Sequence, residues 1–169
     1  MVKIAEENLR FGASELEQAH VCFKEYGFAL LENIIPQDDI ECLTDKIRTF
    51  YQQLLKKEYK KTESLSLDQL YFEAKKEFPE HAPHFMNIVR DFPEFHQFIS
   101  NKALLKISEF FLKTKAIQSV FDTSAMRIDE PNPKPSLEWH QDYPFNMMAD
   151  DTITYWIPIQ DIGIEHGPV

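Results

Sequence analysis

The sequence is poor in cysteine, and its two cysteines do not have the spacing of a structural framework. Cys22 and Cys42 lie 20 residues apart, each within an amphipathic pattern. This placement favours reduced, half-buried thiols over a disulfide framework or a zinc site. Neither cysteine is predicted to be catalytic.

Basic residues are also scarce. Lys and Arg total 18 against 28 Asp and Glu, which gives a formal net charge of -10. An acidic surface repels phosphate backbones and anionic lipid headgroups. We therefore expect neither nucleic acid nor a membrane surface as a partner.

Long hydrophobic runs are absent. No stretch reaches the roughly 18 apolar residues of a membrane-spanning helix, and charged residues interrupt the first ten positions, where a signal peptide needs an apolar segment. The sequence therefore predicts a cytoplasmic protein. Its 169 residues, 43% of them hydrophobic, are enough for one domain, residues 1–169, with a substantial core.

Proline usage divides the chain into a helical front and a strand-rich back. Six of the 10 prolines fall between Pro131 and Pro168. Residues 1–115 show helical periodicity, whereas from residue 116 onward Thr, Ile, Tyr and Trp become dense. The strands expected there are 116–121, 124–128 and 152–159.

The first helices are predicted from their ends as well as their periodicity. Ser14 and Glu17 form a capping-box pattern before a helix at 14–26, and Gly27 is suited to end it. A short strand is expected at 28–31, and Pro36 opens a longer helix.

Similar signals recur further along the chain. Ser66 and Gln69 form a second capping-box pattern, and two helical stretches between residues 83 and 113 are expected to divide near Asn101. Pro93 fits the first turn of a helix capped by Asp91.

The chemically informative segment is Trp139-His140-Gln141-Asp142, which follows a proline-rich loop. If the segment is extended, His140 and Asp142 point to the same side, about 7 Å apart, and can converge on one metal ion. One imidazole, one carboxylate and a second histidine make the facial triad of non-haem iron(II). A His-x-Asp triplet is common by chance, however, and taken alone it favours a surface histidine beside a turn aspartate before Pro144.

Three segments together resemble the phytanoyl-CoA dioxygenase family of iron(II)- and 2-oxoglutarate-dependent oxygenases. They are the opening Gly-aromatic unit around Gly27 and Phe28, the stretch from Met126 to Asp142, and the tryptophan segment 154–159 followed by Glu165-His166-Gly167-Pro168. The resemblance implies an α+β fold, with N-terminal helices packed on a double-stranded β-helix, the jelly roll of cupin-like proteins.

The resemblance also implies roles for individual residues. His140 and Asp142 match the first two iron ligands, and Met126, Gln141 and Trp156 match positions that line the 2-oxoglutarate pocket. Trp156 has the alternative of a core aromatic side chain. The implied activity is hydroxylation of a small-molecule C–H bond with molecular oxygen, and an intact Asp142 argues against halogenation. A nearby arginine, Arg127, is a candidate contact for an anionic group.

The sequence departs from the family at its end. The resemblance implies a second histidine ligand and an arginine for 2-oxoglutarate, and neither stands at a matching position before Val169. His166 lies in the turn instead of the distal strand. The expectation is therefore a jelly roll truncated at its C-terminus, and whether these 169 residues are active on their own stays open on the sequence.

Two other functions stay open on the sequence. One is a non-catalytic binding or interaction protein with the same fold. The other is a cupin-like enzyme with a different metal, which would need further histidines near His140.

Overall fold

The computed structural model describes residues 9–56, 62, 64–118, 124–128 and 151–163. The chain divides into two compact units. The first comprises residues 1–37 and 99–119, and the second comprises residues 38–98 and 120–169. Each unit has its own core, and each is described separately below.

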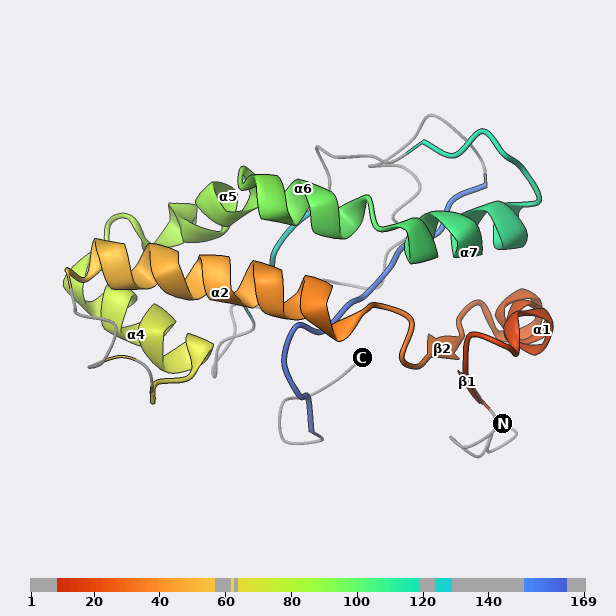
Figure 1. Ribbon diagram of the computed structural model, residues 1–169, viewed down its shortest axis with the longest axis horizontal. Helices are drawn as coiled ribbons and strands as arrows, with labels where there is room; N and C mark the ends of the chain where they lie inside the picture. Colours follow the sequence, from red (N-terminus) through yellow and green to blue (C-terminus); the bar gives the residue numbers. More distant parts are fainter. Residues whose placement is uncertain (1–8, 57–61, 63, 119–123, 129–150, 164–169) are drawn as a thin grey trace. The chain divides into compact units, whose positions relative to one another are not determined.

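The first unit is organised around helix α1 (Leu16–Tyr26) and a pair of very short strands, β1 (Arg10–Phe11) and β2 (Leu30–Leu31). The strands are parallel, with Arg10 opposite Leu30 and Phe11 opposite Leu31, and α1 connects them (Figure 1). The strand expected at 28–31 is confirmed as β2. β1 was not predicted, because two residues are too few to show periodicity.

Helix α1 begins later than its capping-box pattern predicts. Its N-cap is Glu15, and no side chain caps it, so the box expected from Ser14 and Glu17 is wrong. A turn precedes the helix instead: the Glu15 amide donates to the Gly12 carbonyl at 3.0 Å, and the Gly12 amide donates to the Glu15 carboxylate at 2.9 Å. This turn carries the chain past Ser14 before the helix starts.

The end of α1 agrees with the sequence. Gly27 has a φ of 82°, the left-handed conformation that favours glycine, and its amide donates to the Phe23 carbonyl. Helix α7 (Lys102–Leu112) completes the unit and begins at Asn101, whose side chain accepts from the Ala103 amide at 2.8 Å. The division predicted near Asn101 is confirmed.

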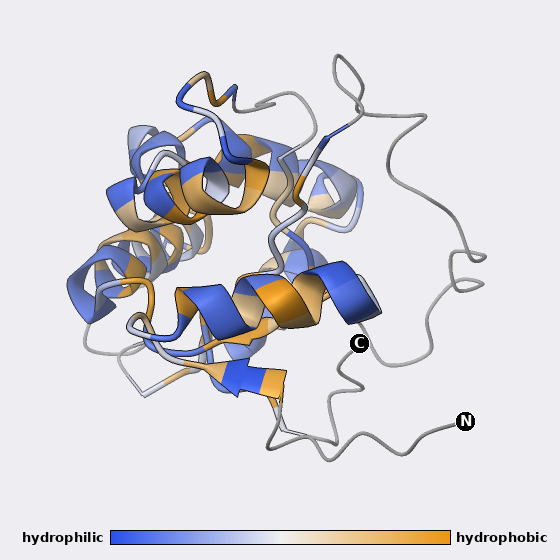
Figure 2. Cartoon of the chain, turned by 90° about the vertical axis from the view of Figure 1, so that its right-hand side faces the viewer, coloured by the Kyte–Doolittle hydropathy of each residue, from blue (hydrophilic) through white to orange (hydrophobic). Residues whose placement is uncertain are grey.

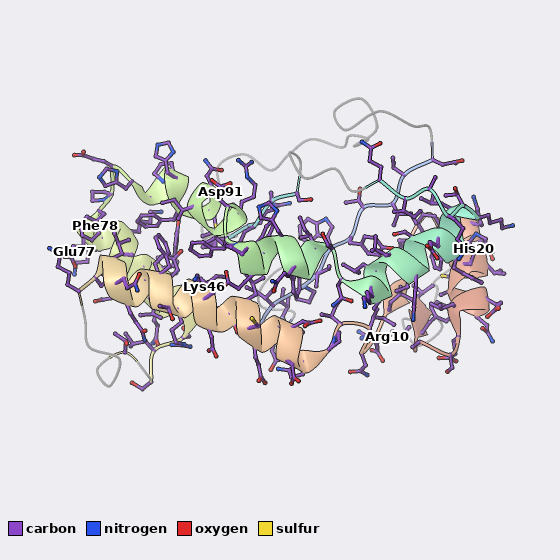
Figure 3. The ribbon with its side chains drawn as sticks, turned by 45° about the horizontal axis from the view of Figure 1, so that its top comes forward. Arg10, His20, Lys46, Glu77, Phe78 and Asp91 are labelled. Carbon is purple, nitrogen blue, oxygen red and sulfur yellow. The ribbon has the colours of Figure 1, made fainter. Side chains whose placement is uncertain are left out.

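Helices α1 and α7 pack through aromatic side chains. The His20 ring contacts both Phe110 and Phe111, with centroids 5.9 and 5.2 Å away, where α1 meets α7 (Figure 3). Phe23 contacts Phe111 at 5.5 Å. The buried residues of the two helices are Ala19, Cys22, Leu104, Ile107, Ser108 and Phe111.

The second unit is helical over most of its described length. Helix α2 (Gln37–Leu54) follows Pro36 and is the longest of the described helices, and α4 (Leu67–Glu77), the 3-10 turn η2 (Ala82–His84), α5 (Phe85–Arg90) and α6 (Pro93–Ile99) follow it. Figure 1 shows α5 and α6 running beside α2. Hydrophobic and hydrophilic residues occur together on the helices (Figure 2), as amphipathic packing requires.

An aromatic cluster holds these helices together. Tyr51 of α2 lies at its centre, with ring centroids 5.9 Å from Phe85 and 6.3 Å from Tyr71. Phe50 meets Phe85 and Phe92 edge to face. Beside it, Lys46 pairs with Glu94 at 3.3 Å and lies over the Phe92 ring.

Helix α4 has the cap that its sequence predicts. The Gln69 amide donates to Ser66 Oγ at 3.1 Å, and the Ser66 amide donates to Gln69 Oε1 at 2.8 Å. The preceding segment is tied to α2 by two polar contacts: buried Gln52 donates to Thr62 Oγ1 at 2.7 Å, and Arg48 donates to the Leu65 carbonyl at 2.7 Å. These bonds fix where α4 begins.

The helix before Asn101 is interrupted at Asp91. Asp91 is the C-cap of α5, so the expectation that it caps the next helix is wrong. Pro93 does begin α6, as predicted. Proline disfavours the helical conformation of the residue before it, Phe92, so α6 begins one residue later than a cap at Asp91 would place it.

The predicted strands are not seen in the described part of the chain. Residues 116–118, 124–128 and 152–159 carry no regular secondary structure, and the sheet recorded among the described residues has only two strands, β1 and β2. A strand needs a neighbouring strand for its hydrogen bonds, and no described residue supplies one to these segments. The jelly roll stays an expectation from the family resemblance.

Both cysteines are free thiols, as expected, but neither is half-buried. Cys22 is buried, with its thiol 3.5 Å from the Phe28 carbonyl oxygen, and Cys42 is exposed.

None of the described helices is both long enough and apolar enough to cross a membrane.

Candidate functional site

The tryptophan segment, residues 151–163, has the alternation of a strand although it is not part of a sheet. Ile153, Tyr155, Ile157 and Ile159 are half-buried, and the residues between them are exposed. A two-residue period is the signature of an extended chain with one side toward the protein. β-branched and aromatic residues favour that conformation.

Trp156 lies on the exposed side of this segment. Its exposed fraction is 58%, which is high for so large an apolar side chain. The alternative of a core aromatic residue is therefore wrong. More than half of the side-chain surface is therefore available for contact with another group.

The short segment 124–128 repeats the same alternation. Ser124, Met126 and Ile128 are half-buried, and Ala125 and Arg127 are exposed. Met126 and Arg127 are neighbours in the sequence, so in an extended chain they point to opposite sides. Arg127 is thus on the exposed side, as Trp156 is in its own segment.

The two segments meet at this pair of side chains. The guanidinium carbon of Arg127 lies over the Trp156 ring, 4.7 Å from its centroid. A cation within about 6 Å of an indole face is attracted by the ring's electrons, and a planar guanidinium also stacks on the ring. The contact joins the segment that carries Met126 to the segment that carries Trp156.

A polar contact attaches the far end of the tryptophan segment to the helices. The amide group of Gln160 donates to both carboxylate oxygens of Asp68, at 3.2 and 3.3 Å. Asp68 lies in the first turn of α4, where a carboxylate interacts favourably with the helix dipole. The tryptophan segment is therefore held at two points. Trp156 contacts Arg127, and Gln160, four residues later, bonds to Asp68.

The predicted site residues are only partly within the described chain. Met126 and Trp156 are described, on neighbouring extended segments. His140, Gln141, Asp142 and His166 lie outside the described residues. Within the described residues, no three His, Cys, Asp or Glu side chains gather in a way that could hold a metal ion.

The sequence did not foresee that Arg127 touches Trp156. Arg127 was a candidate contact for an anionic group, and in the structure one of its contacts is with an aromatic ring. The one sign of this contact lies in the alternation of half-buried and exposed residues in both segments, which puts Arg127 and Trp156 on the exposed sides. The pairing of the two segments has no such signal, because it joins distant parts of the chain.

Comparison with known proteins identifies the family. A family model described as phytanoyl-CoA dioxygenase (PhyH) matches residues 23–169, which is most of the chain. The chain belongs to the phytanoyl-CoA dioxygenase family. A search of curated proteins found no match, and a search of solved structures found none either.

Membership gives a coarse statement of chemistry. Members of the phytanoyl-CoA dioxygenase family are generally dioxygenases, typically dependent on Fe(II) and 2-oxoglutarate, with a cupin-like fold. The donor types at His140 and Asp142, a neutral imidazole nitrogen and an anionic oxygen, suit Fe(II). Both residues fall within the matched range.

Proposed function

We propose that this protein is a non-haem Fe(II)- and 2-oxoglutarate-dependent dioxygenase that hydroxylates a C–H bond of a small molecule. The observation that carries the proposal is the family match, which runs from residue 23 to residue 169 and includes the His140-x-Asp142 motif. The proposal treats residues 1–169 as part of one oxygenase domain and places the enzyme in the cytoplasm.

The proposed roles follow from the chemistry of each side chain. His140 and Asp142 hold the metal, and their two donor atoms leave positions open for other ligands. Gln141, Met126 and Trp156 contact 2-oxoglutarate. The bound iron supplies the activation of oxygen. Overall, the C–H compound, O2 and 2-oxoglutarate become the hydroxylated compound, succinate and CO2, with one oxygen atom in the new hydroxyl group and one in succinate.

The described residues support this arrangement in one respect. Met126 and Trp156 come from separate parts of the sequence, and the structure places their segments in contact through Arg127. Trp156 has more than half of its surface free. An aromatic side chain that is held in place but not covered is suited to binding a small molecule.

The test is a binding and turnover experiment on the protein expressed from its natural reading frame. Fe(II) and 2-oxoglutarate are added without oxygen, and the visible charge-transfer band that the two give together is recorded. Oxygen is then admitted, and succinate is measured. Slow succinate formation without substrate makes the test independent of the unknown substrate.

The variants His140→Ala and Asp142→Ala are compared with His84→Ala and Asp45→Ala, two exposed residues of the same types outside the motif and outside the tryptophan segment. Replacing a residue that only hydrogen-bonds to a metal ligand typically lowers metal affinity by about 10- to 100-fold. We expect His140→Ala and Asp142→Ala to lower it by more than that, because each removes a ligand itself. The second pair should behave as the wild type. No band and no succinate from the wild type would overturn the enzyme assignment in favour of a non-catalytic binding protein.

A further inference from the structure

The contact between Arg127 and Trp156 is an unusual way to hold a tryptophan. Aromatic side chains are ordinarily fixed by burial among other apolar groups, but Trp156 is 58% exposed. The Arg127 guanidinium lies over its ring, 4.7 Å from the ring centroid.

The direction of the two side chains makes this contact possible. Each belongs to an extended segment in which exposed and half-buried residues alternate, and each lies at an exposed position. Their side chains therefore lie along the same surface instead of facing the interior. The guanidinium covers part of one indole face and leaves the rest of the ring accessible.

Arginine suits this task better than lysine does. Its guanidinium is planar, so it can stack on the indole over a broad area, whereas an ammonium group makes a point contact. Its charge is permanent, so the contact persists at every physiological pH.

We propose that Arg127 is a positioning residue for Trp156, holding the indole in the orientation in which its open face meets 2-oxoglutarate. This inference rests on the proposed function for the role of Trp156 in binding the cosubstrate. Arg127 touches no reacting atom in this scheme. It acts through the ring, and its second effect is to keep the Met126 segment beside the tryptophan segment.

The first experiment needs neither iron nor cosubstrate. In a Trp139→Phe background, Trp156 is the only tryptophan of the 169 residues, so its fluorescence is observed alone. Arg127→Ala should raise the acrylamide quenching constant and lower the fluorescence anisotropy, since the ring loses its cover and its support. Arg127→Lys should fall between Arg127→Ala and the parent. Lys76→Ala, which removes an exposed charge from α4, should change nothing.

The second experiment measures 2-oxoglutarate in the protein with both tryptophans. Exposed cation–π contacts correspond to a factor of about 2 to 5 in an equilibrium constant. We expect Arg127→Ala to raise the KM for 2-oxoglutarate by about that factor with kcat nearly unchanged, and Arg127→Lys to restore part of the loss. Trp156→Ala should have a larger effect, and Arg127→Ala should add little to it in the double variant.

The outcomes separate this inference from the proposed function. Unchanged quenching in Arg127→Ala, with circular dichroism and the thermal midpoint preserved, would overturn it. So would changed quenching with an unchanged KM. If the wild type binds no 2-oxoglutarate, the proposed function fails along with the cosubstrate role of Trp156, whereas the quenching result still decides whether Arg127 holds the ring.

Discussion

The imidazole of His20 packs against the ring of Phe111, with centroids 5.2 Å apart, and its buried Nε2 atom has no hydrogen-bond partner among the described residues. Partial burial lowers the pKa of His20 below its usual 6.5, and the positive charges of Lys113 and Lys24 lower it further. Protonation therefore costs more in the folded protein than in the unfolded chain.

This gives a pH prediction for the first unit. The unfolded chain binds a proton at His20 more readily than the folded protein does. The contribution of His20 to the free energy of unfolding is therefore fully present above about pH 6.5 and is lost as the pH falls below that value. His20→Leu should remove that part of the pH dependence, as measured by urea unfolding between pH 7.5 and 5. Exposed His84→Leu is the control and should leave the profile as it is in the wild type. An unchanged profile for His20→Leu would contradict the prediction.

A second prediction compares two serines with similar local sequences. Ser66 forms a complete capping box on α4, whereas Ser14, in the same pattern before α1, caps nothing. Ser66→Ala should lower the free energy of unfolding by about 1 kcal/mol. Ser14→Ala should change it by less than about 0.5 kcal/mol. Denaturant unfolding of the two variants side by side is the measurement, and equal losses would show that Ser14 caps α1 in solution.

The third prediction concerns the hydroxyl group of Tyr51, which is buried in the aromatic cluster and has no hydrogen-bond partner in the part of the chain that the structure describes. Burial and the nearby Tyr71 raise its pKa above the usual value. Since the hydroxyl lost its bonds to water on folding, Tyr51→Phe should be neutral or stabilising, by up to about 1 kcal/mol.

The ring of Tyr51 should behave in the opposite way. Tyr51→Ala should cost about 3 to 5 kcal/mol, because it leaves a cavity among Tyr71 and Phe85. Thermal and denaturant unfolding of both variants separate the two contributions. A clear loss of stability in Tyr51→Phe would mean that the hydroxyl has a partner in solution.

Local signals in the sequence predicted local structure well. Gly27 ends α1 because the conformation there suits glycine, and the Ser66 cap and the Asn101 cap depend only on residues within three positions. The Ser14 pattern failed for a local reason too, since the turn between Gly12 and Glu15 competes with it. Sequence patterns cannot weigh two such hydrogen-bonded alternatives against each other.

Features that depend on distant residues were not predictable. The density of Thr, Ile, Tyr and Trp predicted a strand at 152–159, and no strand is seen there, because a strand also needs a partner that local composition does not identify. The same holds for the candidate site. Trp156 was singled out by family resemblance, whereas its exposure and its contact with Arg127 required the fold.

The parallel pairing of β1 with β2 has a consequence for local opening. Two strands of two residues each are too short to persist alone, so the strand pairing and the packing of α1 against β1 support each other. The Glu32 amide donates to the Phe11 carbonyl at 2.9 Å at the end of this pairing. The Glu32 amide becomes free to exchange with deuterium when β1 and β2 separate. If its exchange is faster than that of the buried helix amides, the strand pair opens locally, without unfolding of the whole chain.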